Sequence, residues 1–162
     1  MRSFEKISFK QFSEDIGDNR QLYDSYKLPE RKSKNAAGYD FYLVNELVLW
    51  PGERKVIPTG VKAKYPDDEF LLLAIRSSIG FEYNIRLCNQ VGIIDSDFYN
   101  NPENEGHIYL AIQNESDMLI KIPAGEAIAQ GLFLKYYTCG DEVKDERYGW
   151  SLLDDQPKTY YK

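Results

Sequence analysis

Histidine, cysteine and methionine are scarce in this chain of 162 residues, which contains one His, two Cys and two Met. A single histidine, His107, excludes a zinc site built from several imidazoles and disfavours Ser-His-Asp catalysis. Cys88 and Cys139 are too few and too irregularly placed for a disulfide framework or a thiolate metal site. We therefore expect reduced thiols and a cytoplasmic location.

Long apolar runs and an excess of positive charge are also missing. No apolar stretch approaches the ~20 residues that a membrane span needs, and the N-terminus does not resemble a signal peptide. The formal net charge is −6, so the chain offers no general basic surface for nucleic acid. We expect neither a membrane nor a nucleic acid as partner, and a polyanionic ligand would need local cations and a metal ion.

Aromatic residues, in contrast, are abundant, with 13 Tyr and 8 Phe. Such residues are enriched in strands, which favours a β-rich chain over a helical bundle. Short apolar segments alternate with Pro and Gly turns, for example at Pro51-Gly52 and at Pro58-Thr59-Gly60. We therefore expect a single all-β domain with a closed antiparallel architecture.

The chain divides into three predicted parts. They are residues 1–35, an N-terminal extension, residues 36–138, the β domain, and residues 139–162, an acidic and polar C-terminal arm. Within the first part, Ser8 and Gln11 have the spacing of a capping box before an apolar stripe. This pattern predicts one short helix near residues 8–17, whereas residues 80–84 are expected to form a loop.

One stretch, residues 76–99, gathers the side chains that can carry chemistry. It begins with a cation and two hydroxyls, continues with one amide among apolar residues, and ends with two carboxylates beside two aromatic rings. In order, these residues are Arg76, Ser77, Ser78, Asn89, Asp95, Asp97, Phe98 and Tyr99. A guanidinium with two hydroxyls can hold phosphate oxygens at one end, while a carboxylate acts at the other.

Each member of this set also has a simpler structural explanation. An Arg-Ser-Ser sequence alone is more often a polar turn. Asp95 follows a buried-looking strand, where partial desolvation would raise its basicity, but it can also close that strand as an Asx turn. Asn89 is expected within an apolar strand, with its amide either bonded to backbone or facing a ligand. Only the joint spacing favours a functional site.

That spacing resembles motifs two and three of the trimeric dUTPases, in which an Arg-Ser pair is followed by Asn and then by Gly-x-Ile-Asp-x-Asp-Tyr. Residues 37–40, Ala-Gly-Tyr-Asp, are similar to motif one, and residues 127–133 are similar to motif four. Residues 100–108 resemble an insertion found in Gram-positive bacteria and their phages. The resemblance covers roughly residues 36–135. It implies a distorted jelly roll, also called a β-clip, assembled as a homotrimer with active sites shared among subunits.

The resemblance also implies an activity, the Mg²⁺-dependent hydrolysis of dUTP to dUMP and pyrophosphate. Asp95 would activate water for attack on the α-phosphorus, and Asp40 would hold the hydrated Mg²⁺ through water. The implied substrate contacts are Arg76, Ser77, Ser78, Asn89, Phe98, Gln130, Arg147 and Trp150.

The chain departs from the family pattern at three places. Ala127 stands where family members usually have Arg, and Phe98 replaces a Tyr whose ring packs on the deoxyribose. The glycine-rich fifth motif is reduced to residues 147–151, in which Arg147 would meet the γ-phosphate and Trp150 would stack on the base.

Two alternative functions stay open. The altered arm favours a non-catalytic nucleotide-binding or regulatory protein that keeps the fold. The related dCTP deaminases share the Arg-Ser-Ser start, but Ala111 occupies the position where their catalytic glutamate is expected, which disfavours deamination. For His107 we expect a structural hydrogen bond in its loop rather than a contact with substrate.

Overall fold

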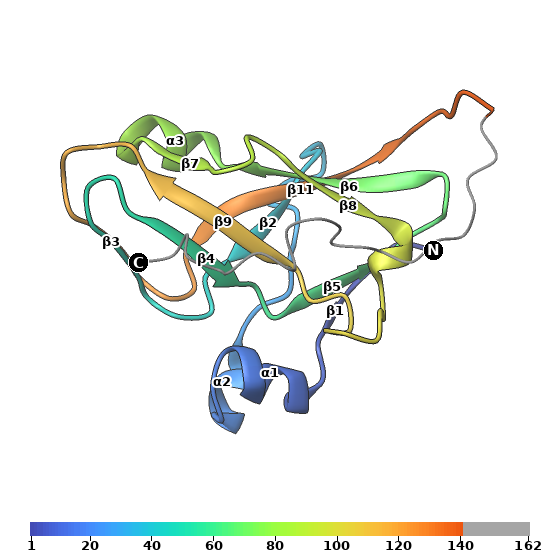
Figure 1. Cartoon of the computed structure of the whole chain (residues 1–162), viewed down its shortest axis with the longest axis horizontal. Coiled ribbons are helices and arrows are strands. Elements are labelled where there is room, and N and C mark those ends of the chain that lie inside the picture. The colour runs from blue at the N-terminus through green and yellow to red at the C-terminus, as the bar shows by residue number, and fades with distance from the viewer. Residues whose placement is uncertain (141–162) are drawn as a thin grey trace, which may run out of the picture.

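Short antiparallel strands dominate the computed structural model, which describes residues 1–140 of the chain (Figure 1). The strands are β1 (Ser3–Lys6), β2 (Tyr39–Tyr42), β3 (Leu47–Leu49), β4 (Arg54–Pro58), β5 (Val61–Lys64), β6 (Glu69–Ile75), β7 (Ile85–Leu87), β8 (Gly92–Asp95), β9 (Tyr109–Asn114), β10 (Ile120–Ile122) and β11 (Ala127–Lys135). The helices are α1 (Phe9–Asp15), α2 (Arg20–Ser25), α3 (Ser77–Tyr83) and the 3₁₀ helix η1 (Ser96–Phe98). The predicted all-β class is confirmed.

The strands are arranged in four sheets. The largest has the order β2-β11-β6-β8, a second has the order β4-β9-β7, and two pairs join β1 to β5 and β3 to β10. Because β7 and β8 are consecutive but lie in different sheets, the chain changes sheet between them. Side chains from these sheets share one main core, whose fully buried members include Phe41, Leu49, Leu71, Leu73, Leu87, Ile112 and Ile128.

Strand β6 is the middle of the largest sheet, and its burial alternates along the chain. Leu71 and Leu73 are buried in the core, whereas Phe70, Leu72 and Ala74 are only half-buried on the outer face. One face of β6 thus lies in the core, and the other is only partly covered by the described residues.

The predicted Pro and Gly turns are present. Gly52, between β3 and β4, has a φ of 72°, and Gly60, between β4 and β5, has a φ of 74°. Both values lie in the left-handed region that glycine adopts without a steric penalty. Because β3, β4 and β5 lie in three different sheets, these two turns carry the chain from one sheet to the next.

The N-terminal helix forms where the sequence predicts it. The Ser8 hydroxyl accepts a hydrogen bond from the Gln11 N–H at 3.1 Å, as in a capping box. The Gln11 side chain does not complete the box, because it donates to Asp15 instead. A second helix, α2, was not expected. Its only local signal is Asn19, whose side-chain oxygen accepts from the Leu22 N–H.

The first part of the chain is bound to the β domain. Strand β1 pairs with β5, and α1 and α2 project from the lower side of the molecule in Figure 1. A small separate core of Ile7, Phe12 and Val44 packs against side chains of both helices. The boundary at residue 35 stays a prediction. None of the described helices has the length and apolar character needed to cross a bilayer.

His107 joins the N-terminal helix to the loop before β9. Its ring is fully buried, with Nδ1 2.6 Å from an Asp15 oxygen, while Nε2 accepts a hydrogen bond from the Gly60 N–H at 2.8 Å. Since Nε2 is an acceptor, the proton of the neutral ring lies on Nδ1. Burial lowers the pKa of His107 below its ordinary 6.5, although the carboxylates of Asp15 and Glu105 oppose the shift. Tyr109 faces the same ring.

Replacing His107 by Gln tests the hydrogen bonds of His107 with Asp15 and Gly60. We expect the free energy of unfolding to fall by about 1–3 kcal/mol near neutral pH, because buried hydrogen-bonding groups lose their partner. In the parent chain the unfolded state binds a proton near the ordinary pKa of 6.5 while the folded state resists it, so stability falls as pH drops below that value. Urea unfolding between about pH 7.5 and about pH 5.5 measures both effects.

The variant should lack this part of the pH dependence, so the two stability curves converge toward low pH. Asp15→Asn is the matched control, since it removes the carboxylate charge but keeps an acceptor oxygen for Nδ1–H. Parallel curves for the parent chain and the His107 variant would contradict this prediction, because they would mean that His107 has the same pKa in the folded and in the unfolded chain.

Candidate active site

Arg76 stands at the end of β6, where the chain turns into α3. The helix extends to Tyr83 and ends at Asn84, which has a left-handed φ of 51°. The expectation of a loop over residues 80–84 is therefore wrong. Ile79 is buried and anchors this helix on the core, a tertiary contact that overrides the unfavourable Gly80. Ser77 and Ser78 lie in its first turn beside Arg76.

Three of the predicted site residues meet at this end of the largest sheet. Asp40 in β2 and Gln130 in β11 are direct partners in the strand register. The Arg76 Nε lies 3.2 Å from an Asp40 oxygen, and its Nη1 donates to the Ala127 carbonyl at 3.4 Å. We call Asp40, Arg76, Ser77, Ser78 and Gln130 the Arg76 cluster. It combines donors for an anion with one buried carboxylate.

Asp40 has an oxygen that the described residues do not satisfy. The residue is 7% exposed, Oδ1 is paired with Arg76, and Oδ2 is buried without a hydrogen-bond partner. A buried carboxylate oxygen left unpaired is costly, which points to a partner that is not part of residues 1–140.

This oxygen fits a hydrated divalent ion, because metal-bound water can donate to it. Within residues 1–140 no group of three or more His, Cys, Asp or Glu side chains could hold a metal directly. A site with one carboxylate nearby suits an ion that keeps most of its water and is bound mainly by phosphates.

Asp95 lies at the opposite end of the same sheet. It is the last residue of β8 and pairs with Phe70 at the start of β6, with η1 and Phe98 directly after it. The expected burial of its strand is wrong, because β8 is an edge strand and Ile93 is 61% exposed. Asp95 is likewise exposed to solvent in the single chain.

The two ends are too far apart to act on one phosphate within a single chain. Arg76 directly follows β6 and is six positions after Phe70, the strand partner of Asp95. At a rise of about 3.3 Å per strand residue, this places the backbone of Asp95 roughly 20 Å from that of Arg76. Water activated by Asp95 therefore cannot reach a phosphate held by Arg76 of the same chain.

An apolar area on the outer face of the sheet lies between the two ends. Strand register places Leu132 of β11, Leu72 of β6 and Ile93 of β8 side by side, with Leu134 and Phe70 in the next row. Cross-strand partners point to the same face of a sheet, so these five side chains form one surface, which we call the outer apolar face. All five are half-buried or exposed in the single chain.

Asn89 lies outside the strands. It belongs to the turn between β7 and β8, is exposed, and its carbonyl accepts from the Val91 N–H at 2.7 Å. Gln90 has a positive φ of 66° in this turn. The expectation of an amide inside an apolar strand is therefore wrong, and the core explanation for Asn89 is excluded with it.

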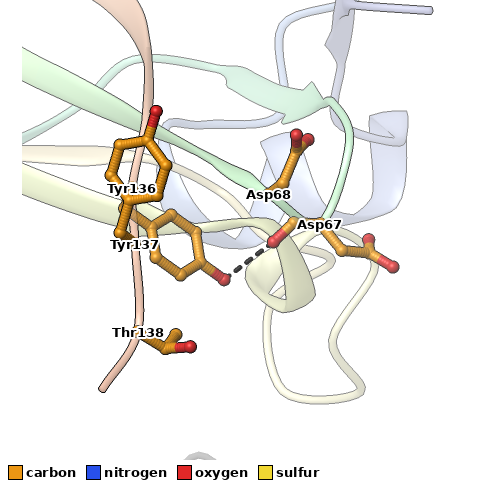
Figure 2. A pocket seen from close by; sticks show the side chains of 5 residues that line it. All are labelled: Asp67, Asp68, Tyr136, Tyr137 and Thr138. Carbon is orange, nitrogen blue, oxygen red and sulfur yellow. Dashed lines mark hydrogen bonds between the residues drawn. The ribbon is translucent and has the colours of Figure 1, made fainter. Parts of the chain in front are cut away.

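A hollow of about 490 Å³ lies at the Asp95 end of the sheet, between the β5–β6 turn and the segment after β11 (Figure 2). It is lined by Asp67, Asp68, Tyr136, Tyr137 and Thr138, and the Tyr136 hydroxyl donates to the Asp67 carbonyl at 2.7 Å. These five residues include two carboxylates and no cation, and the neighbouring Lys135 is already paired with Asp68 at 2.8 Å. The lining of this hollow therefore suits a polyphosphate less well than the Arg76 cluster does.

Two predicted substrate contacts, Arg147 and Trp150, lie outside the described residues. One residue that contacts the Arg76 cluster, Gly38, was not predicted as a site residue. Gly38, which precedes β2, lies against the Gln130 side chain. Its place in motif one is visible in the sequence, but the contact depends on the pairing of β2 with β11.

Comparisons with known proteins agree with this geometry. A family model described as dUTPase matches residues 24–148. The deoxyuridine 5′-triphosphate nucleotidohydrolase of Lactococcus lactis is 41% identical over 125 residues, which are 75% of this chain and 83% of that protein. A second one, from a Thermoanaerobacter species, is 38% identical over 105 residues, which are 64% of this chain and 67% of that protein.

Solved structures show the same likeness. The crystal structure of a dUTPase from Streptococcus mutans has a TM-score of 0.69 and 35% identity, covering 84% of this chain and 97% of that one. A dUTPase of staphylococcal phage 80alpha with bound dUpNHpp has a TM-score of 0.65 at 22% identity, covering 97% and 95%, and supports the fold alone. From the matched motifs, the sequence relatives and the shared fold, we conclude that this chain belongs to the dUTPase family.

Proposed function

We propose that the chain hydrolyses dUTP to dUMP and pyrophosphate. The observation that carries this proposal is the Arg76 cluster, in which the guanidinium pairs with a buried carboxylate that has one unsatisfied oxygen, Gln130 is the strand partner of that carboxylate, and two hydroxyl residues directly follow the guanidinium in the chain. Family membership and the curated names of the relatives support dUTP as the substrate.

The cluster would bind the triphosphate. Arg76 is held at Nε by Asp40 and at Nη1 by the Ala127 carbonyl, so its Nη2 can donate to phosphate oxygens without a large rearrangement. Ser77 and Ser78 add hydroxyl donors, and Gln130 adds an amide donor. Preorganised donors of this kind provide much of the rate enhancement in phosphoryl transfer.

Members of the family use a divalent metal ion, and we propose Mg²⁺ for this chain. When bound to the triphosphate, the ion would offset its negative charge and fix its conformation. Asp40 would hold the hydrated ion by accepting hydrogen bonds from its water at Oδ2.

Asp95 would be the general base. Its carboxylate takes a proton from water, the water oxygen bonds to the α-phosphorus, and the bond from that phosphorus to the bridging oxygen breaks to release pyrophosphate. A positioned base of this kind contributes roughly 10²–10⁴ in rate. Asp95 is exposed to solvent in the single chain.

A second copy of the chain would supply Asp95 to each Arg76 cluster. The separation of roughly 20 Å along β6 requires a partner, given the rise of about 3.3 Å per residue. The outer apolar face lies between the two half-sites and offers a surface that association would bury. We propose a homotrimer, in which a cyclic arrangement gives every Arg76 cluster one neighbouring Asp95.

The remaining predicted contacts would select the nucleoside. Asn89 is exposed in a turn, so its amide can reach uracil, and a site built to hydrogen-bond uracil would leave its groups unpaired against cytosine. The ring of Phe98 would pack on the deoxyribose, and Arg147 and Trp150 of the arm would meet the γ-phosphate and the base. We place this reaction in the cytoplasm, where nucleoside triphosphates are used.

The direct test measures pyrophosphate released by the purified chain from dUTP in the presence of Mg²⁺, with a chelator and with dCTP as comparisons. We expect turnover of dUTP that stops when the metal is removed and a much lower rate with dCTP. Binding of dUTP without pyrophosphate release would favour a regulatory nucleotide-binding protein instead. Ammonia release from dCTP would indicate a deaminase.

Changing Asp95 to Asn should lower kcat by about 10²–10⁴-fold, because the amide cannot accept the proton from water. The affinity for dUpNHpp should change little, since the substitution leaves the phosphate donors of the Arg76 cluster unaltered. Pyrophosphate release and calorimetric binding measure the two quantities. Asp67→Asn, at the same sheet end, is the matched control and should keep full turnover. An active Asp95 variant would remove this carboxylate from the mechanism.

Mixing two inactive variants tests whether the site is shared. Arg76→Gln removes the phosphate donor, and Asp95→Asn removes the base. When equal amounts are refolded together, a site built from two chains is intact where an unaltered Arg76 meets an unaltered Asp95. Random assembly of a closed ring makes this about one quarter of the sites, so about one quarter of parent activity should return.

Each variant refolded alone is the control, together with size-exclusion chromatography to confirm that the mixed oligomer forms. If mixed oligomers form and no activity returns, each site uses Arg76 and Asp95 from one chain, and the shared arrangement is wrong.

A further inference from the structure

Gly38 occupies a position where backbone conformation does not require glycine. It precedes β2 and is not among the residues with a positive φ. An alanine could adopt this backbone without strain. The reason for the missing side chain must therefore be found in the space around it.

That space is filled by Gln130. A Cβ added at Gly38 would lie 2.5 Å from the Gln130 Oε1, 3.2 Å from its Cβ and 3.3 Å from its Cδ. The Gln130 side chain thus lies along the bare Cα of Gly38, closer than any other residue type at position 38 would allow.

The close contact with Gly38 fixes the position of the Gln130 amide, because no other described residue holds it by a hydrogen bond. The Gln130 amide forms no hydrogen bond with residues 1–140, and the side chain is only half-buried. Its strand partner is Asp40, whose carboxylate holds Arg76. Gly38 therefore leaves the amide on the strand next to Asp40, with its hydrogen-bonding atoms available to a ligand.

We propose that Gly38 is a positioning residue, whose bare Cα keeps the Gln130 amide directed at the phosphate chain of the nucleotide. This inference rests on the proposed function, because it deepens the role of the Arg76 cluster in binding dUTP. A methyl group at position 38 would displace the flexible end of Gln130 and leave the backbone in place. The fold should survive while the amide loses its orientation.

A double-mutant cycle of Gly38→Ala, Gln130→Ala and both together tests the proposal. Loss of an amide donor to a charged phosphate should lower kcat/KM by about 10–100-fold in Gln130→Ala, and Gly38→Ala should reproduce a large part of that loss. The double variant should be no worse than Gln130→Ala alone within about twofold, because the methyl group then has nothing to displace.

Gly80→Ala is the matched control. Its added methyl would lie 3.5 Å from the Ile75 Cγ2, an ordinary contact, so kcat/KM should stay at the parent value. Thermal unfolding of all variants shows whether the fold is kept. If the two single losses multiply in the double variant, or if Gly38→Ala equals the parent while Gln130→Ala is impaired, Gly38 does not position Gln130.

The same cycle on the Kd of dUpNHpp separates this proposal from the proposed function. A parent chain that binds the analogue but releases no pyrophosphate contradicts the enzymatic function, and the non-additive pattern in Kd still supports the role of Gly38. A parent chain that binds neither dUpNHpp nor dUTP contradicts both.

Discussion

The length of β6 is the constraint on which the candidate site depends. This strand carries Arg76 at one end and is paired with Asp95 at the other, so the two chemical functions are separated by a rigid, hydrogen-bonded distance. Strand pairing fixes this separation far more firmly than a loop would. The chain consequently contains every residue that the proposed reaction needs, while the folded monomer holds them apart.

The pairing of Asp40 with Arg76 makes one of these half-sites ready for an anion before it binds. A buried carboxylate without a cation would be strongly destabilising, and Arg76 satisfies only one of its two oxygens. The remaining oxygen still lacks a partner within residues 1–140. Such an arrangement carries a cost in the free chain that a phosphate-bound, hydrated metal ion would relieve, so binding energy and stability are coupled at Asp40.

Local sequence was a good guide where the structure depends on neighbouring residues. Ser8 caps α1 as its spacing predicts, the turns at Gly52 and Gly60 have the expected positive φ, and β2 begins directly after Gly38. Resemblance to the dUTPases added the residues of the Arg76 cluster, which strand register brings together although they are far apart in the sequence.

The errors have a common cause, since each concerns tertiary placement. Asn89 and Asp95 follow or precede apolar residues that look buried, but β8 is an edge strand and the chain changes sheet at Asn89. Helix α3 forms because Ile79 reaches the core, in a segment whose Gly and aromatic residues favour a loop locally. No local pattern distinguishes a strand covered on both faces from one with an exposed outer face.

The outer apolar face connects these errors to the proposed assembly. Leu72, Leu132 and Ile93 belong to strands whose sequences look buried on both sides, and they remain partly exposed in the single chain. If a second copy covers this face, the apolar pattern correctly describes the oligomer and misdescribes only the monomer. The same association would bring a carboxylate from one chain toward the Arg76 cluster of another. Burial of the apolar face and completion of the active site would then be one event, so that only the assembled protein could hydrolyse its substrate.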